Sequence, residues 1–294
     1  MRNHLAPTPG VSQHFPGSKV MLQQNHWAIL FGLTLGLTAW WSGGLNPHPV
    51  QAESAATAPP QLKNALTQID AAANNRNVQA VMQFYSKNFA HSDGLTYQSL
   101  EKTLAELWKR YPKLTYKTEL QSWQPSGNGF SAETVTRITG VQSLKNRDVK
   151  LEATLRSQQR FENQKIVRQE ILAERTQLTA GTNPPKVEMQ LPEQVPAGQE
   201  FSFDAIVREP LGNKLLLGSA VEETVKPSSY LSSAPINLEL LSGGGLFKIG
   251  RAPAQPANRW ISALLIREDG MTLITQRLRV TGRDNRSNAP KPKR

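Results

Sequence analysis

His91 and Asp93 are the two residues of this sequence whose types and spacing best fit proton transfer. An imidazole and a carboxylate two positions apart can share a hydrogen bond, and one of them can then act as a general base. The alternative is a hydrogen-bonded turn, because Ser92-Asp93-Gly94 is a typical turn sequence. In such a turn the carboxylate of Asp93 is solvated, and we expect its pKa to be low. A catalytic role of Asp93 and His91 is therefore the weaker of the two interpretations.

The remaining composition excludes several kinds of chemistry. The 294 residues include no Cys, which excludes disulfides, thiolate nucleophiles and Cys-bound metals. Of the five His residues, only His91 lies outside the first 52 residues. A His-rich zinc site is therefore not available in a chain that has lost this segment. We expect no cofactor and no metal.

Apolar residues at helical spacing predict three amphipathic helices between residues 62 and 111. Leu62, Leu66, Ile69 and Ala73 share one face of the first helix. The second helix is expected over residues 78–89 and the third over residues 100–111, where Thr96 can cap the start and Pro112 can end it. Three aromatic side chains of these helices could frame an apolar pocket, although such residues usually form core. They are Tyr85, Trp108 and Tyr111.

The spacing changes to two over residues 114–178, which predicts four long antiparallel strands joined by short turns. Ser157 and Gln159 continue the face that carries Leu151 and Leu155 and could line the mouth of a pocket, and the alternative is a solvated end of the strand. Val167, Ile171 and Ala173 are expected to share one face of the fourth strand. The predicted fold class is α+β: a cone-shaped, curved antiparallel sheet with three N-terminal helices, followed by a small all-β sandwich domain.

The C-terminal part is predicted to be a separate β module. Residues 180–186 contain Gly and two Pro residues and are interpreted as a linker after an α+β domain at 62–179. Residues 187–282 predict seven short strands at regular spacing, which is typical of an immunoglobulin-like sandwich. Residues 283–294 are polar and basic, and we expect a disordered tail that could weakly contact an anionic surface.

The N-terminal residues predict export. The uncharged, mostly apolar run from Trp27 to Trp41 has the length of a signal-peptide core, and Val50-Gln51-Ala52 fits a cleavage site. We therefore expect a signal peptide at residues 1–52, a flexible leader at 53–61, and a mature protein in the periplasm, the thylakoid lumen or outside the cell. The alternative is an uncleaved N-terminal membrane anchor.

The net charge of +11 does not indicate nucleic-acid binding, because both termini contribute much of the excess. In the predicted strands, Arg156, Arg160, Arg168 and Arg175 alternate with Glu residues. This pattern favours cross-strand charge pairing over a basic stripe.

The stretch Leu62–Leu178 resembles the nuclear transport factor 2-like (SnoaL-like) family. The resemblance rests on Phe84-Tyr85-Ser86-Lys87-Asn88-Phe89, on Ser92-Asp93-Gly94, on Leu107-Trp108-Lys109-Arg110-Tyr111-Pro112 and on the strands that follow. It implies a cone with a pocket between helices and sheet. The family includes isomerases and dehydratases as well as many binding and protein-interaction members. The ketosteroid-isomerase-like members need an oxyanion donor opposite the base, and no Tyr–Asp pair can be matched here.

Two functions follow from these observations. The first is an exported, non-enzymatic binding or interaction module whose pocket holds a small apolar ligand or a protein partner. The second is a small-molecule isomerase or hydrolase that uses Asp93 and His91. The sequence leaves the oligomeric state open, with a homodimer among the alternatives.

Overall fold

The structure is a computed structural model, and it describes residues 52–144, 147–230, 235–241 and 243–282. The predicted signal peptide, apart from Ala52, and the predicted basic tail lie outside the described residues. No helix in these ranges is both apolar enough and long enough to cross a lipid bilayer.

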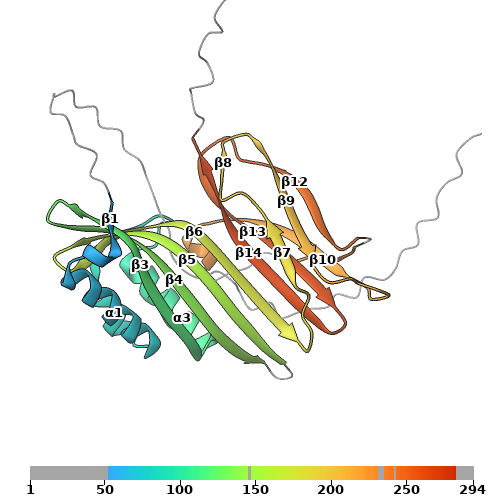
Figure 1. The fold of residues 1–294 in the computed structure, drawn as a ribbon, viewed down its shortest axis with the longest axis horizontal. Coiled ribbons are helices and arrows are strands. Elements are labelled where there is room, and N and C mark those ends of the chain that lie inside the picture. The colour runs from blue at the N-terminus through green and yellow to red at the C-terminus, as the bar shows by residue number, and fades with distance from the viewer. Residues whose placement is uncertain (1–51, 145–146, 231–234, 242, 283–294) are drawn as a thin grey trace, which may run out of the picture.

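The α-helices lie in the N-terminal half (Figure 1). After β1 (Glu53–Ser54) and the 3-10 helix η1 (Ala55–Thr57) come α1 (Pro60–Asn74), α2 (Val78–Met82) and α3 (Tyr97–Arg110). Pro60 is the first residue of α1, where its missing N–H leaves no helical hydrogen bond unmade. Asn77 caps α2, and Thr96 and Ser99 form a reciprocal capping box at the start of α3.

The predicted second helix is wrong beyond Met82. Residues Tyr85–His91 form the strand β2, which pairs in parallel with β6 (Lys165–Gly181). Tyr85 and Phe89 are both buried, with their rings 5.0 Å apart at nearly right angles. A spacing of four fits a helix face, but it also fits every second inward position of a strand, so the apolar pattern alone did not separate the two.

One large sheet runs through the whole molecule. Its described residues form eleven strands, with β3 (Lys113–Ser126), β4 (Gly129–Leu144), β5 (Arg147–Glu162) and β6 as consecutive antiparallel neighbours. The other edge of β6 pairs with a strand from the C-terminal end of the chain. The sheet continues in the order β14 (Gly270–Thr281), β13 (Ala257–Arg267), β10 (Leu217–Thr224) and β11 (Glu239–Leu240).

The predicted fold class is therefore wrong, both in the cone with three N-terminal helices and in the separate small sandwich. The finding that overturns it is the antiparallel pairing of β6 with β14, in which Arg175 lies opposite Gln276 and Gly181 opposite Gly270. Alternating apolar residues show that a segment is a strand, but they do not show which strand lies beside it.

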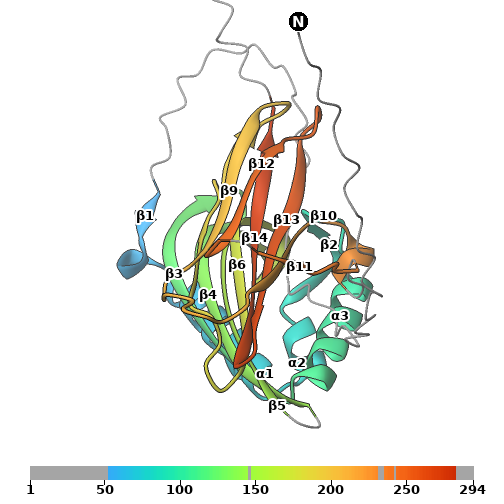
Figure 2. The ribbon, with the colours of Figure 1, turned by 90° about the vertical axis from the view of Figure 1, so that its right-hand side faces the viewer.

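A second, smaller sheet covers the C-terminal part of the large one (Figure 2). It has the order β12 (Gly245–Arg251), β9 (Glu200–Val207), β7 (Val187–Gln190). The short strand β8 (Gln194–Pro196) pairs with β14, and the 3-10 helix η2 (Pro227–Tyr230) follows β10.

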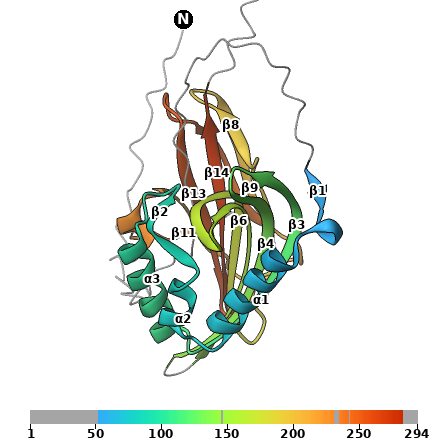
Figure 3. The same cartoon turned by 90° about the vertical axis from the view of Figure 1, so that its left-hand side faces the viewer.

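Strands β13 and β14 are buried on both faces. Leu264 and Leu273 belong to the core that the helices form with β3–β6, whereas Ala263 and Ile274 belong to the core under the second sheet. Figure 3 shows the helices gathered on one face of the large sheet. The predicted domain boundaries stay predictions, although Ala180 and Gly181 of the proposed linker belong to β6.

Candidate functional site

The candidate site is a small cavity between the helices and the inner face of β3–β6. Its volume is about 60 Å³. Helix α1 contributes residues at i, i+3, i+4 and i+7, because these positions lie on one face of a helix. The strands contribute every second residue, as in Leu155, Ser157 and Gln159. The lining consists of Leu66, Ile69, Asp70, Ala73, Val81, Tyr85, Leu104, Trp108, Tyr116, Thr118, Thr136, Ile138, Leu155, Ser157, Gln159, Gln169 and Ile171.

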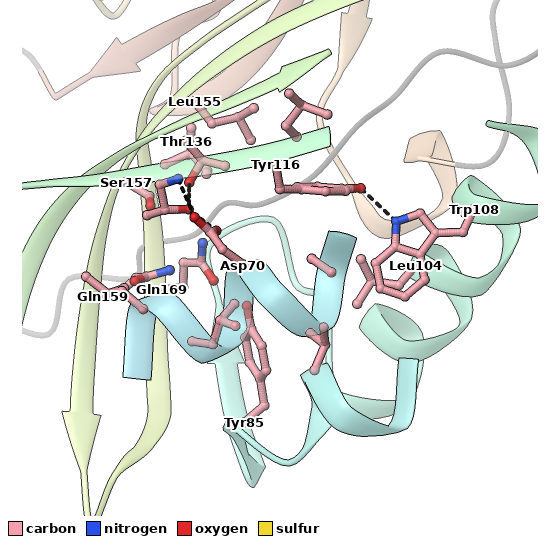
Figure 4. A pocket seen from close by; sticks show the side chains of 17 residues that line it. Asp70, Tyr85, Leu104, Trp108, Tyr116, Thr136, Leu155, Ser157, Gln159 and Gln169 are labelled. Carbon is pink, nitrogen blue, oxygen red and sulfur yellow. Dashed lines mark hydrogen bonds between the residues drawn. The ribbon is translucent and has the colours of Figure 1, made fainter. Parts of the chain in front are cut away.

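The cavity has a polar end and an aromatic end (Figure 4). At the aromatic end, the Trp108 indole N–H donates to the Tyr116 hydroxyl at 2.8 Å, and the two rings meet nearly at right angles. Burial raises the pKa of Tyr85 and of Tyr116 above the ordinary range. Both phenols are therefore protonated at neutral pH and can act only as hydrogen-bonding groups.

Asp70 is the carboxylate at the polar end. Its two oxygens accept from the backbone N–H and the hydroxyl of Thr118, each at 2.6 Å, and the Thr118 hydroxyl also lies 3.0 Å from that of Thr136. Because Asp70 projects from α1 and Thr118 lies on β3, these bonds fix the helix against the sheet.

Two amide oxygens at the same end lack partners. Gln159 and Gln169 lie directly opposite each other on β5 and β6, and both are buried. Among the described residues, neither side-chain oxygen has a hydrogen-bond partner. Leaving a buried acceptor unpaired costs about 1–3 kcal/mol. A bound molecule with a hydrogen-bond donor would remove this cost.

Four of the five residues predicted to line the pocket do so: Tyr85, Trp108, Ser157 and Gln159. Tyr111 is buried at the end of α3 but does not line the cavity. Sequence reasoning missed Asp70 and Gln169. A charged residue between Ile69 and Ala73 on the apolar stripe of α1 was the signal for Asp70.

Asp93 and His91 are not part of this cavity. The expectation that Asp93 lies in a solvated turn is wrong, because its side chain is fully buried. Arg277 donates to both carboxylate oxygens, at 3.0 and 2.9 Å, and Tyr230 and Asn258 also donate to them. These donors come from β14, η2 and β13, so Asp93 contacts residues far along the chain.

Electrostatics match this geometry. Burial alone would raise the pKa of Asp93, but the charge and hydrogen bonds of Arg277 and the Tyr230 hydroxyl lower it below its ordinary value. Burial lowers the pKa of His91 to about 3, so this imidazole is neutral at physiological pH. Its Nδ1 accepts a long bond of 3.4 Å from the Asp93 N–H.

Arg277 has a second carboxylate partner in Glu174 of β6. One Glu174 oxygen accepts from Arg277 Nη2 at 2.8 Å and from the Trp260 indole at 2.9 Å. Burial raises the pKa of Glu174 to about 7, Arg277 and Trp260 oppose this rise, and Asp93 adds to it. We call Asp93, Glu174 and Arg277 the buried triad. Since every Asp93 oxygen is already engaged, the triad is a structural ion network rather than a base facing a ligand.

Within the ranges that the structure describes, no group of three or more His, Asp or Glu side chains is arranged to hold a metal ion. The buried triad has two carboxylates, and an arginine already occupies the position between them.

Comparison with known proteins gives limited information. Residues 182–281 match a family described as a domain of unknown function (DUF8623), which covers the C-terminal strands and none of the cavity residues. No curated protein matches the sequence. Several solved structures are similar in part, and two of them each have a TM-score of 0.28.

The first of these is Bd1075 of Bdellovibrio bacteriovorus, 17% identical over 37% of this chain; the match spans only 39% of the Bd1075 chain. The second is an M. tuberculosis LEH-like epoxide hydrolase, 9% identical over 38% of this chain and 80% of that chain.

Proposed function

We propose that this chain is a non-enzymatic binding module whose cavity under the helices holds a small, mostly apolar molecule with a hydrogen-bond donor. The observation that carries the proposal is the pair of partnerless amide oxygens, Gln159 and Gln169, in a cavity whose other walls are largely apolar. Specific polar groups in an apolar cavity are typical of small-molecule sites. A volume of about 60 Å³ fits a molecule of a few heavy atoms or the end group of a larger one.

The alternative, an isomerase or hydrolase using Asp93 and His91, has less support. Neither residue lines the cavity, and the Asp93 carboxylate accepts from Arg277, Tyr230 and Asn258. A general base must reach the proton that it removes.

A pocket between helices and sheet also favours the resemblance of Leu62–Leu178 to nuclear transport factor 2-like proteins, which we retain as part of the proposal.

Export belongs to the same proposal. The apolar run Trp27–Trp41 and the site Val50-Gln51-Ala52 support cleavage after Ala52, with the ligand met in the cell envelope, the thylakoid lumen or the medium. N-terminal sequencing of protein from the native host tests this, and a mature chain that keeps Trp27–Trp41 would contradict it.

Ligand binding is tested with matched small probes. Propionamide has N–H donors, and butanone, which has the same number of heavy atoms and a similar shape, has none. We expect the first to bind and to shift the NMR signal of the Trp108 indole N–H, which lies in the cavity wall. Mass spectrometry of molecules that co-purify with the native protein then identifies the natural ligand.

A variant that fills the cavity provides the control. Ala73→Val adds two methyl groups on the cavity side of α1, and Ala71→Val makes the same change on its exposed side. The loss of helix propensity is the same in both variants. We expect Ala73→Val to abolish probe binding and Ala71→Val to retain it. Equal binding by both variants, or a shift with both probes, would refute the proposed site.

A further inference from the structure

Arg175 on β6 has no carboxylate within 4.0 Å in the part of the chain that the structure describes. It projects from the face of the sheet opposite to the cavity, since its neighbour Glu174 points inward to Arg277. Its guanidinium is half-buried and donates to the Gln276 amide oxygen at 3.3 Å. Burial lowers its pKa, and no carboxylate opposes this effect. A partly buried cation without an anion costs free energy.

Other arginines of the described strands differ in this respect. The cross-strand pairing predicted from the sequence is found for Arg156, which contacts Glu133 of β4, whereas Arg160 pairs with Glu162 of its own strand. Six further arginines of these strands have a carboxylate within 4.0 Å: Arg137, Arg251, Arg259, Arg267, Arg277 and Arg279.

A second guanidinium lies beside Arg175. Arg156 of β5 is opposite Ala173, and Arg175 is opposite Thr154, so the two arginines are diagonal neighbours. Glu193 and Glu133 contact the terminal nitrogens of Arg156 at 3.3 and 3.9 Å. Its Nε is buried and has no partner among the described residues.

Both arginines line an open hollow of about 400 Å³. Its other walls include Thr154, Gln276, the rim carboxylate Glu193, and Glu174 and Arg277, which pair with each other. The hollow thus has one guanidinium without a counter-ion and one buried N–H donor without an acceptor. Carboxylate and phosphate oxygens satisfy both, and arginine is the residue best suited to bind them.

We propose that this hollow is a binding site for a compact oxyanion, a carboxylate or phosphate group held between Arg175 and the Nε of Arg156. The site lies on the other face of the sheet from the cavity, and it is independent of the function proposed for that cavity. The anion supplies the charge that Arg175 lacks and the acceptor that Arg156 Nε lacks. The negatively charged carboxylate of Glu193 lies at the rim of the hollow. It limits the site to anions small enough to bind deeper in the hollow than this carboxylate.

The test measures thermal stability and NMR signals of the arginine Nε–H groups while inorganic phosphate or malonate is added. Chloride at equal ionic strength serves as the reference, because it controls for general screening. We expect saturable shifts of the Arg156 and Arg175 signals and a rise in Tm with phosphate, since a ligand that binds only the folded state stabilises it.

Arg175→Gln is the decisive variant, and Arg160→Gln is its control. Arg160 is on the same strand as Arg156 but pairs with Glu162 and does not line the hollow. We expect Arg175→Gln to fold with an unchanged or higher Tm and to lose at least about tenfold in phosphate affinity. Arg160→Gln should bind as the wild type does. No saturable binding, or equal affinity in both variants, would overturn the proposal.

Vesicles separate the two sources of such an anion. Binding to phosphatidylglycerol vesicles, absent with phosphatidylcholine and lost in Arg175→Gln, would assign the site to a lipid phosphate. Binding of free phosphate or malonate without vesicle binding would assign it to a soluble anion.

Discussion

Replacing Glu174 by Gln should make the protein more stable at pH 8 and leave its stability almost unchanged at pH 5. The buried triad holds one arginine and two carboxylates, so it is neutral only when one carboxylate keeps a proton. Arg277 and the Tyr230 hydroxyl lower the pKa of Asp93, whereas burial raises the pKa of Glu174, and the proton therefore belongs to Glu174. Gln has the shape of protonated Glu, and its oxygen can accept from Trp260 as Glu174 does.

The size of the effect follows from the pKa. Burial raises the pKa of Glu174 from an ordinary 4.5 to about 7. The folded state therefore binds this proton more tightly than the unfolded state. The resulting stability is fully present below about pH 4.5 and is lost as the pH rises through 7. At about 1.4 kcal/mol for each pKa unit, the loss reaches about 3 kcal/mol at pH 8.

His91 has the opposite dependence. Its folded-state pKa is lowered from 6.5 to about 3, so its contribution is present above about pH 6.5 and is lost on acidification. The two effects offset each other in the wild type. The informative quantity is therefore the difference in the free energy of unfolding between Glu174→Gln and the wild type, in which the His91 contribution cancels.

Urea denaturation at several pH values between 5 and 8 measures this difference. We expect it to grow with pH in favour of Glu174→Gln by about 3 kcal/mol. A difference that stays constant over this range would show that Glu174 does not change its protonation, and would refute the assignment of the proton within the triad.

Three further outcomes are expected. Arg277→Met leaves two buried carboxylates without a cation, and should lower the free energy of unfolding by about 3–5 kcal/mol at neutral pH; a loss below about 1 kcal/mol in urea denaturation would contradict this. Gln169→Leu removes a partnerless acceptor, so we expect unchanged or slightly higher stability together with weaker propionamide binding; calorimetry that shows a large loss of stability would indicate that the oxygen is satisfied. Gly129→Ala places a Cβ against the Phe161 carbonyl, and we expect a lower Tm with more than about 1 kcal/mol lost; an unchanged Tm would mean that the turn adapts freely.

The strands were the predictable part of the fold. Residue alternation predicted four strands over residues 114–178, where β3–β6 lie, and seven over residues 187–282, where β7–β14 lie. The neighbours of β6 were not predictable. Its second edge pairs with β14, nearly a hundred residues later, and nothing in the alternation of either strand specifies the other.

The site was predictable only where the alternation is regular. Ser157 and Gln159 follow Leu155 at every second position of β5 and reach the cavity. On β6 the register shifts opposite Arg156 and Ser157, so Ala173 faces outward although Ile171 faces inward. The expectation that these two residues share a face was wrong for this reason. The same register shift, a β-bulge, turns the side chain of Glu174 inward to Arg277.

The buried triad also explains how the two halves of the sheet find one register. A slip of β14 by two residues against β6 would keep each side chain on its own face, so apolar burial alone discriminates weakly between such registers. The contacts of the triad distinguish strongly between these registers. Arg277 contacts Glu174 and Asp93 only when Gln276 lies opposite Arg175. Any other register would bury Arg277 away from one or both carboxylates, at a cost of several kcal/mol. We infer that the ion network favours the observed pairing of β6 with β14 over registers shifted by two residues.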